Sequence, residues 1–380
     1  MAELLLEEVS RYSRHLILPE VGLEGQRKLK NSKVLCVGSG GLGSPIAMYL
    51  AAAGVGTLGI IDDDIVTETN LQRQIIHSTR NLLRPKVTSA KERIEDINPY
   101  IEVIAINRRL DASNALPIFK DYDVIVDGTD NFGIRYLIND ACVLLGKPDV
   151  YGGVLRVEGQ ASVFHYQGGA CLRCLYSEEP LPGTVPTCTE GGILNVLPGI
   201  IGCIQANETI KILLGKGETL SNRLLMFDSW KMKFREITLQ KDPLCPVCGT
   251  HPVITELKDG SGFCCASGNS PDESAESIEV TEWRHLIETE ADKIQIIDVR
   301  EEYETALGTL PNVENIKVKN IPSGQIVCRK DELSPAKFNV FICTSGVRSQ
   351  QTVKTLLAAG FEGHIASLRG GINAWRQSYI

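Results

Sequence analysis

The sequence lacks three features that would place it in a familiar class. It has no surplus of basic charge, since 39 Lys and Arg face 47 Asp and Glu, whereas nucleic-acid-binding domains usually carry a basic surface. Its first ten residues are acidic and hold no apolar run of the kind found in secretory signals. The uncharged stretch 191–207 falls short of the roughly 20 apolar residues of a membrane helix. We therefore expect a cytoplasmic protein that neither contacts nucleic acid directly nor enters a membrane.

The chain is long, and it is rich in cysteine. A length of 380 residues predicts two or three domains at roughly 100–200 residues each. Twelve cysteines in a reducing compartment indicate metal ligands, nucleophiles or core residues rather than disulfides. Cys36, Cys142 and Cys203 lie in apolar runs, and we expect them to fill the core.

Short apolar runs alternate with helical patterns from residue 33 onward. This alternation predicts an α/β fold with a parallel sheet covered on both faces. Between residues 151 and about 239 the pattern predicts antiparallel segments. The predicted strands are 34–37, 57–62, 103–106 and 123–127, and the predicted helices are 45–53 and 86–97.

A Gly/Ser/Asp/Glu-rich stretch without periodicity separates two α/β patterns. It predicts a flexible linker, which could span about 66 Å when extended. Beyond it we expect strands 294–299 and 340–343 and helices 349–359 and 372–377, which would form a smaller domain. The predicted boundaries are 1–256 for the first domain, 257–277 for the linker and 278–380 for the second domain.

A glycine-rich motif follows the first predicted strand and leads into a helix. Its glycines are Gly38, Gly40, Gly41 and Gly43. Such a loop allows close backbone approach, and a helix N-terminus favours an anion. Asp62 ends the next strand, where a carboxylate can bind ribose hydroxyls. A tight turn without a ligand is one alternative, and the dinucleotide site of an NAD-dependent dehydrogenase is another.

Charged and amide side chains beyond this acid favour a triphosphate over a nicotinamide. Cations offset charge on phosphoryl oxygens, and a carboxylate can hold Mg²⁺. No Gly-Lys-Ser/Thr phosphate loop occurs in the chain, which excludes a P-loop enzyme. No obvious catalytic histidine lies near these motifs. The residues are Asn70, Arg73, Gln74, Lys86, Asp130 and Asn131.

Two Cys-x-x-Cys pairs can supply four thiolates to one zinc ion. They are Cys171/Cys174 and Cys245/Cys248. Four thiolates make a closed, structural zinc site. For either pair alone the competing interpretation is a redox dithiol, and the presence of two pairs favours zinc.

Another cysteine, Cys343, begins a short loop between a predicted strand and a predicted helix. Backbone N–H groups and the helix dipole would favour a thiolate or an anionic persulfide there, and Arg348 would add positive charge. Tyrosine phosphatases place arginine one position later in such a loop, which argues against that class.

The first domain resembles the MoeB/ThiF family of adenylating enzymes, relatives of the ubiquitin-activating enzymes. The resemblance covers 11–248 and rests on the opening 11–19, the glycine loop, the segment from Asp62 to Gln74, Lys86 and 129–131. It implies a Rossmann-like domain with a zinc knuckle. It further implies that ATP adenylates the C-terminal glycine of a ubiquitin-like sulfur carrier ending in Gly-Gly.

The resemblance also implies roles for individual residues. Asp62 would bind ribose, Arg73 and Lys86 the phosphates, and Asp130 Mg²⁺, with Asn70 and Gln74 beside the reacting phosphate. Arg14 would reach the partner subunit's triphosphate, which implies a homodimer. Cys188 aligns with a cysteine that can bind the carrier covalently, and the alternative is an inert loop cysteine.

The second domain resembles rhodaneses over 280–380. The resemblance rests on the Cys343 loop, on 298–301 and on 368–375. The fusion is MoeZ-like and implies that a persulfide on Cys343, charged from thiosulfate or a cysteine desulfurase, converts the adenylated carrier to a thiocarboxylate. Two alternatives stay open: a rhodanese domain serving a different acceptor, and a dimeric nucleotide-binding scaffold without turnover.

Overall fold

The chain forms two compact units, Met1–Cys264 and Cys265–Ile380, in a computed structural model. The structure describes residues 3–179, 191–258, 277–306, 308, 310, 316 and 318–378.

An eight-stranded sheet forms the centre of the first unit, in the order β3-β2-β1-β4-β5-β6-β7-β8. Strands β3 to β5 pair in parallel, and β5 to β8 pair antiparallel. This confirms the predicted parallel sheet followed by antiparallel segments. The strands are β1 Lys33–Val37, β2 Thr57–Ile61, β3 Glu102–Ile106, β4 Val124–Asp127, β5 Asp149–Leu155, β6 Glu158–Phe164, β7 Arg223–Asp228 and β8 Lys233–Thr238.

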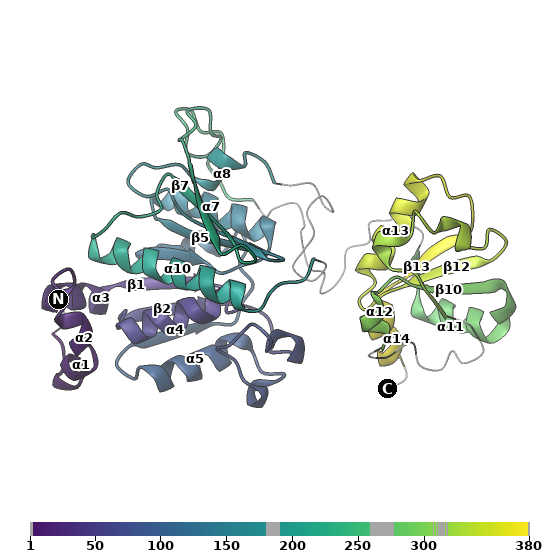
Figure 1. Cartoon of the computed structure of the whole chain (residues 1–380), viewed down its shortest axis with the longest axis horizontal. Helices are drawn as coiled ribbons and strands as arrows, with labels where there is room; N and C mark the ends of the chain where they lie inside the picture. The colour runs from purple at the N-terminus through teal and green to yellow at the C-terminus, as the bar shows by residue number, and fades with distance from the viewer. Residues whose placement is uncertain are drawn as a thin grey trace. The chain divides into compact units, whose positions relative to one another are not determined.

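Helices cover both faces of the parallel half of this sheet. Alternate residues of β1 divide between two cores: Val34 and Cys36 pack on one face, and Leu35 and Val37 on the other. The first core includes residues of α4, α5 and α10, which lie in front of the strands in Figure 1. The second includes residues of α6 and α7. Burial on both faces explains why these strands read as continuous apolar runs.

The helices of this unit are short, apart from those that pack on the sheet. They are α1 Leu6–Arg11, α2 Ser13–Leu16, α3 Gly22–Asn31, α4 Gly43–Ala53, α5 Lys86–Ile97, α6 Ala115–Phe119, α7 Phe132–Leu145, α8 Leu172–Leu175 and α10 Val196–Leu214, with 3₁₀ turns η1 Glu68–Asn70 and η2 Thr79–Asn81.

The uncharged stretch near residue 200 lies largely in α10, the 19-residue helix Val196–Leu214. This helix packs on α4, β5 and β6, so its apolar residues belong to the core of the protein. No helix among the described residues is long and apolar enough to cross a membrane. The sequence analysis did not predict α10 as a helix, because an apolar run of this kind lacks the periodicity of an amphipathic helix.

The prediction that Cys203 fills the core is wrong. Cys36 and Cys142 are buried as expected, whereas Cys203 is exposed. It lies on α10, two residues after the buried Ile201. Helical geometry turns a residue two positions onward to another face, and an apolar run does not reveal which face meets solvent.

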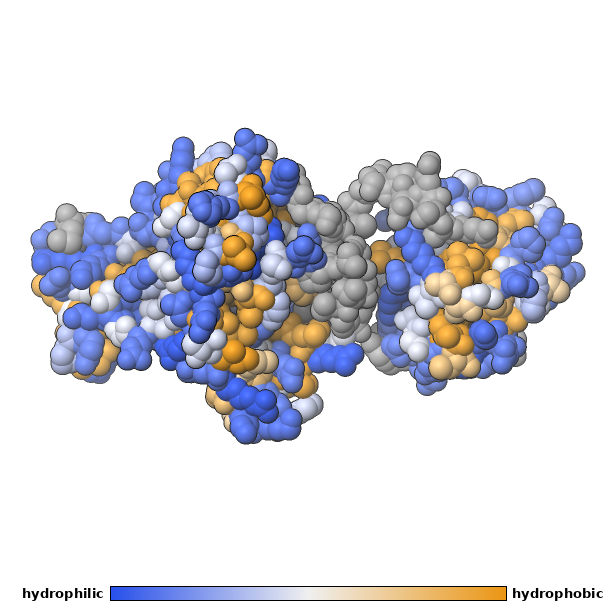
Figure 2. All heavy atoms as spheres, turned by 90° about the horizontal axis from the view of Figure 1, so that it is seen from above, coloured by the Kyte–Doolittle hydropathy of each residue, from blue (hydrophilic) through white to orange (hydrophobic). Residues whose placement is uncertain are grey.

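Strand β8 is the edge of the large sheet, and all six of its residues are exposed. The ring of Phe234 stacks on Phe227 of β7 with centroids 4.4 Å apart. Trp230 and Met232, in the turn before β8, are each 72% exposed. Figure 2 shows orange, hydrophobic patches between hydrophilic stretches on the visible surface of each unit.

The second unit has a five-stranded sheet in the order β11-β10-β12-β13-β9, with every pair parallel. Trp283 and Trp375 are fully buried and meet edge to face with centroids 6.4 Å apart. The elements are β9 Ser277–Ile278, α11 Val280–Thr289, η3 Ala291–Lys293, β10 Ile294–Asp298, α12 Glu302–Ala306, β11 Val318–Asn320, η4 Ser323–Gln325, η5 Lys330–Glu332, β12 Phe338–Ile342, α13 Val347–Ala358, β13 Ile365–Leu368 and α14 Gly371–Gln377.

Candidate functional site

The glycine loop lies where the strand order of the large sheet reverses. It follows β1, whose neighbours are β2 and β4, and ligands of open α/β sheets bind at this switch point, outside the carboxyl ends of the strands. Gly38 has φ +91°, and a Cβ on Gly43 would lie 2.1 Å from the Gly38 carbonyl oxygen. The loop backbone therefore closes on itself at the start of α4. No side chain in the described part of the chain caps this helix, so N–H groups can meet an anion there.

Asp62 holds the glycine loop from the end of the neighbouring strand β2. One carboxylate oxygen accepts from the backbone N–H of Ser39 at 2.9 Å and from its hydroxyl at 3.1 Å. The other oxygen accepts from the N–H of Asp64 at 2.9 Å. The side chain predicted to bind ribose is thus anchored next to the loop predicted to approach phosphates.

Arg73 and Gln74 lie against the middle of the same loop. A Cβ on Gly40 would be 3.6 Å from the Gln74 amide nitrogen, and one on Gly41 would be 3.6 Å from Arg73 Cγ. Gln74 is 5% exposed, and its amide oxygen has no hydrogen-bond partner among the described residues. The structure therefore brings together residues more than thirty positions apart. Asn70 supports this turn through its carbonyl, which accepts from the N–H groups of Arg73 and Gln74 at 3.1 and 2.9 Å.

Lys86 is the first residue of α5 and is nearly buried. Its ammonium donates to the carboxylate of Asp64 at 2.8 Å, and the Asp64 side chain is 69% exposed. Because Asp64 also donates its N–H to Asp62, Lys86 belongs to the same cluster as the ribose-side carboxylate.

The segment after β4 reaches the glycine loop from the other side. A Cβ on Gly38 would lie 3.0 Å from the Gly128 carbonyl oxygen, so the two loops touch. Asp130 follows and is exposed, which leaves its carboxylate open to a cation. Asn131 caps α7, since its side-chain oxygen accepts from the N–H of Ile134 at 3.1 Å.

Arg14 is the one predicted nucleotide residue that lies on a different part of this unit. It is exposed on α2, a helix that contacts α1 and α3. The other predicted nucleotide residues gather around the carboxyl ends of β1, β2 and β4.

Two buried residues beneath this site were not predicted from the sequence. Arg135 donates to the Thr129 carbonyl at 2.8 Å and lies 3.7 Å from the Asp127 carboxylate. Burial raises the pKa of Asp127, and the charge of Arg135 opposes that rise. His77 is the second, with ring nitrogens near Ser39 and Ser89. His77 follows the predicted nucleotide residue Gln74 by three positions, and this closeness in sequence was the available indication that it lies near the site.

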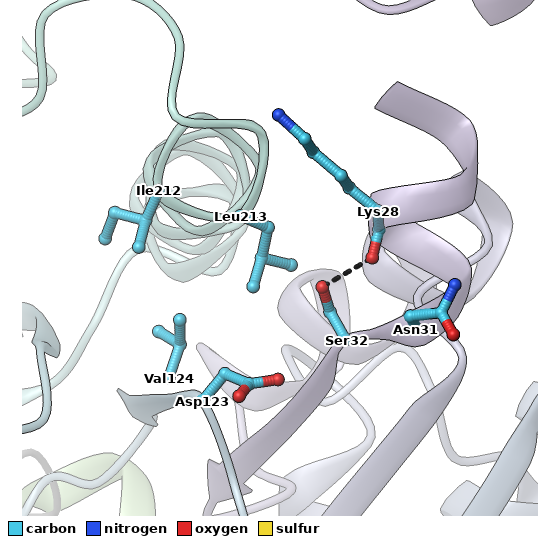
Figure 3. A pocket seen from close by; sticks show the side chains of 7 residues that line it. All are labelled: Lys28, Asn31, Ser32, Asp123, Val124, Ile212 and Leu213. Atoms are coloured by element: carbon cyan, nitrogen blue, oxygen red, sulfur yellow. Dashed lines mark hydrogen bonds between the residues drawn. The ribbon is translucent and has the colours of Figure 1, made fainter. Parts of the chain in front are cut away.

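A cavity of about 350 Å³ lies at the other end of the strands, away from the glycine loop (Figure 3). Ser32 and Asp123 directly precede β1 and β4, so this cavity is at the amino ends of the strands. Ile212 and Leu213 of α10 line it together with Lys28 of α3. It is therefore separate from the glycine loop and its charged residues.

The four cysteines of the two Cys-x-x-Cys pairs form one cluster. Their sulfurs lie within 4.8 Å of one another, and three of the distances are 3.9, 3.6 and 3.4 Å, for Cys171–Cys174, Cys171–Cys245 and Cys174–Cys248. Zn–S bonds of about 2.3 Å in a tetrahedron require sulfur separations of about 3.8 Å. The donor set and its spacing therefore fit zinc. Two independent dithiols would not require all four sulfurs to lie this close together.

The surroundings of the cluster also favour a cation. Burial raises the pKa of the Cys171 thiol and raises that of Cys248 to about 12. Burial therefore opposes formation of the thiolate at Cys171 and Cys248 unless a positive charge lies among the sulfurs. A bound zinc ion supplies that charge and stabilises the thiolates.

In the second unit, Cys343 directly follows β12 and is 1% exposed. The backbone N–H groups of Gly346 and Ser349 donate to its sulfur at 3.2 and 3.4 Å. The hydroxyl of Ser349 lies 3.5 Å from the sulfur and 2.8 Å from the hydroxyl of Ser367. Donors converging on one sulfur suit a thiolate or a persulfide.

The position of Arg348 in the sequence suggested that it adds positive charge to this loop, but its charge is paired. Its guanidinium forms two hydrogen bonds with the carboxylate of Glu304 on α12, at 2.7 and 2.6 Å. This ion pair compensates much of the charge. Glu304 lies 44 residues earlier, so the sequence alone did not indicate the pairing.

Comparisons with known proteins give both units a family. A model of the ThiF family matches residues 12–247. The chain belongs to the ThiF family. A model of the rhodanese-like domain matches residues 280–378, so a ThiF-family domain and a rhodanese-like domain occur in one chain, as the sequence analysis expected.

Relatives of this ThiF-family chain share one or both domains. The "Probable adenylyltransferase/sulfurtransferase MoeZ" of Mycobacterium tuberculosis is 44% identical over 375 residues, covering 97% of this chain and 93% of that protein. The "Sulfur carrier protein adenylyltransferase" of Thermus thermophilus is 46% identical over 263 residues, covering 68% of this chain and 97% of that protein. A crystal structure of E. coli MccB with ATP is 25% identical with a TM-score of 0.55, covering 63% of this chain and 73% of that chain.

One predicted site residue of the ThiF-family domain belongs to a segment that the structure does not describe. Cys188, the candidate for a covalent link with the carrier, lies outside the described residues.

Proposed function

We propose that this chain is an adenylyltransferase and sulfurtransferase that converts the C-terminal carboxylate of a ubiquitin-like sulfur carrier to a thiocarboxylate. The observation that carries the proposal is the presence of two complementary sites in one chain. A cluster of phosphate-binding character surrounds the glycine loop, and a sulfur surrounded by hydrogen-bond donors lies in the rhodanese-like domain. The full-length similarity to MoeZ supports this combination.

In the first step, ATP lies along the carboxyl ends of β1, β2 and β4. Asp62 binds the ribose, while Arg73 and Lys86 bind phosphates, with Lys86 exchanging the exposed Asp64 for a phosphoryl oxygen. Asp130 holds Mg²⁺, which supplies positive charge to the phosphates. The resemblance implies that Asn70 and Gln74 lie beside the reacting phosphate, and Asn131 is a further candidate ligand of the nucleotide. The crystal structure of E. coli MccB with ATP supports the choice of nucleotide.

The chemistry of this step requires little of the protein beyond position and charge. A carboxylate oxygen of the carrier attacks the α-phosphorus, the bond to the bridging oxygen breaks, and pyrophosphate leaves. Because the carboxylate is already ionised, no general base is needed, and catalysis rests on orientation and charge stabilisation. The product is an acyl adenylate.

In the second step the outer sulfur of a Cys343 persulfide attacks the acyl carbon, and AMP leaves. The carrier is then joined to Cys343 through an acyl disulfide. A second thiol attacks Cys343 Sγ, which releases the carrier thiocarboxylate and leaves a disulfide for cellular thiols to reduce. Cys188 is the candidate for this second thiol. Thiosulfate or a cysteine desulfurase supplies the sulfur.

Three further properties belong to the same proposal. The chain acts in the cytoplasm, its domains are bounded at 1–256 and 278–380 with a linker between them, and it functions as a homodimer. The exposed position of Arg14 on α2, away from its own glycine loop, supports a role at the partner subunit's site. Mixing Arg14→Ala with Lys86→Ala subunits should then restore part of the adenylation activity, because one site of each mixed dimer keeps both residues. Mixed dimers that form but stay inactive would contradict the trans role.

ATP–pyrophosphate exchange with the full chain and a carrier ending in Gly-Gly tests the first step. We expect exchange that depends on the carrier and on Mg²⁺. Nucleotide binding without exchange would instead favour a dimeric scaffold. Exchange without sulfur transfer to the carrier would favour a rhodanese-like domain that serves a different acceptor.

A further inference from the structure

His77 is a buried histidine that the proposed reaction does not use. It is 6% exposed and lies between the glycine loop and α5. Its Nε2 is 3.0 Å from the carbonyl oxygen of Ser39, and its Nδ1 is 2.9 Å from the hydroxyl of Ser89. One ring thus joins a residue of the loop to a residue of the helix that begins with Lys86.

The two partners determine the state of the ring. A carbonyl oxygen can only accept, so Nε2 carries a proton and donates it to Ser39, and in the neutral ring Nδ1 accepts from the hydroxyl of Ser89. Burial lowers the pKa of His77, and the nearby charge of Lys86 acts in the same direction. Both ring nitrogens are engaged in holding neighbouring groups.

Ser39 is consequently held from two sides. Its N–H and its hydroxyl donate to Asp62, while its carbonyl accepts from His77. In a trans peptide the carbonyl of one residue and the N–H of the next point in opposite directions. The bond from His77 therefore directs the N–H of Gly40 away from the buried ring. No residue in the described part of the chain accepts from the N–H of Gly40 or Gly41.

We propose that His77 is a positioning residue for nucleotide binding. By joining Ser39 to α5, it turns the N–H groups of the glycine loop outward and holds them in register with the Lys86 ammonium, so that both contact the same nucleotide phosphates. This role rests on the proposed function only in its choice of ATP as ligand. It is independent of which acceptor follows adenylation.

A matched pair of substitutions separates donation by His77 from the space it fills. His77→Leu removes the donor at similar size, whereas the amide nitrogen of His77→Gln can still donate to the Ser39 carbonyl. The full chain of each variant is measured for ATP affinity by equilibrium binding, and for KM and kcat in ATP–pyrophosphate exchange. Ser78→Ala, a change in the exposed neighbour, is the control. Thiosulfate sulfurtransferase activity of the same chains reports on the second unit.

We expect His77→Leu to raise the Kd and KM for ATP about tenfold, equivalent to about 1.4 kcal/mol, with a smaller change in kcat. His77→Gln should recover most of this affinity, and sulfurtransferase activity should stay constant. If His77→Leu does not fold, His77→Asn, whose amide is too short to reach Ser39, replaces it.

Equal losses in the leucine and glutamine variants, or unchanged ATP affinity in both, would overturn the positioning role. A wild-type chain that binds ATP but shows no exchange would refute the proposed adenylation, while the Kd values would still decide the role of His77. A wild-type chain that does not bind ATP would overturn both.

Discussion

The proposed nucleotide site collects side chains from several separate segments, whereas the proposed sulfur site is built almost entirely from one loop, residues 343–349. Around the glycine loop, Asp62 directly follows β2, Arg73 follows η1, Lys86 begins α5, and Asp130 lies between β4 and α7. In the rhodanese-like domain, the N–H groups of the loop itself surround one buried sulfur. A triphosphate presents many charges over a long molecule, while a persulfide presents one. The two designs match these ligands, and they predict different sensitivities to substitution.

The largest effect should come from the sulfur site, because its chemistry depends on one atom. Cys343→Ala should reduce thiosulfate sulfurtransferase activity to the uncatalysed rate, since no other group can carry the persulfide. ATP–pyrophosphate exchange should remain near the wild-type rate. Cyanide-dependent thiocyanate formation measures the first activity. Residual transfer above background would show that another cysteine carries sulfur.

In the nucleotide site a single substitution should lower the rate without removing every contact. Asp130→Ala should reduce ATP–pyrophosphate exchange about 100- to 1,000-fold, as expected for loss of one group that stabilises transition-state charge. Sulfurtransferase activity should not change. Exchange is measured over a range of Mg²⁺ concentrations, and Asp130→Asn is the matched variant. Wild-type exchange in Asp130→Ala would place the Mg²⁺ ligand elsewhere.

A substitution in the cysteine cluster should lower the stability of the first unit alone. Cys245→Ser should lower the zinc content from one ion per chain to near zero and should cost several kcal/mol of stability, because a structural zinc contributes its binding free energy to folding. Metal analysis and thermal unfolding test this, with Cys203→Ser as the control for loss of a thiol. A stable wild-type protein without metal would refute the zinc assignment.

The smallest effect concerns the ion pair beside the sulfur loop. Arg348 holds the pKa of Glu304 below its ordinary value of 4.5. A carboxylate with a lowered pKa stabilises the folded state fully above its ordinary pKa, and that contribution is lost as the pH falls through the lowered value. Glu304→Gln should therefore cost about 1 kcal/mol at pH 7 and less near pH 4.

Urea unfolding of the full chain followed by tryptophan fluorescence can measure this difference, because Trp283 and Trp375 are buried in the second unit and Trp230 is exposed in the first. The exposed neighbour Glu302 provides the control Glu302→Gln. A loss of equal size at both pH values would show that the pair does not account for the effect.

The same contrast explains how much could be predicted from the sequence. Gly38, Asp62 and Cys343 stand next to predicted strands, so local patterns located them, and the parallel sheet was predicted from its buried strands. His77 and Glu304 were not found, since their partners Ser39 and Arg348 lie 38 and 44 residues away. The exposure of Cys203 depended on the rotation of an apolar helix, which an apolar run does not encode.

The most direct test of cooperation between the two sites is the intact mass of a Gly-Gly carrier after incubation with ATP, Mg²⁺ and the full chain. With thiosulfate as donor, the wild-type chain should replace one carboxylate oxygen by sulfur, and neither Cys343→Ala nor Asp130→Ala should do so. Bisulfide attacks the adenylate directly, so it should restore the mass shift with Cys343→Ala but not with Asp130→Ala. A carrier thiolated from thiosulfate by Cys343→Ala at the wild-type rate would contradict the account.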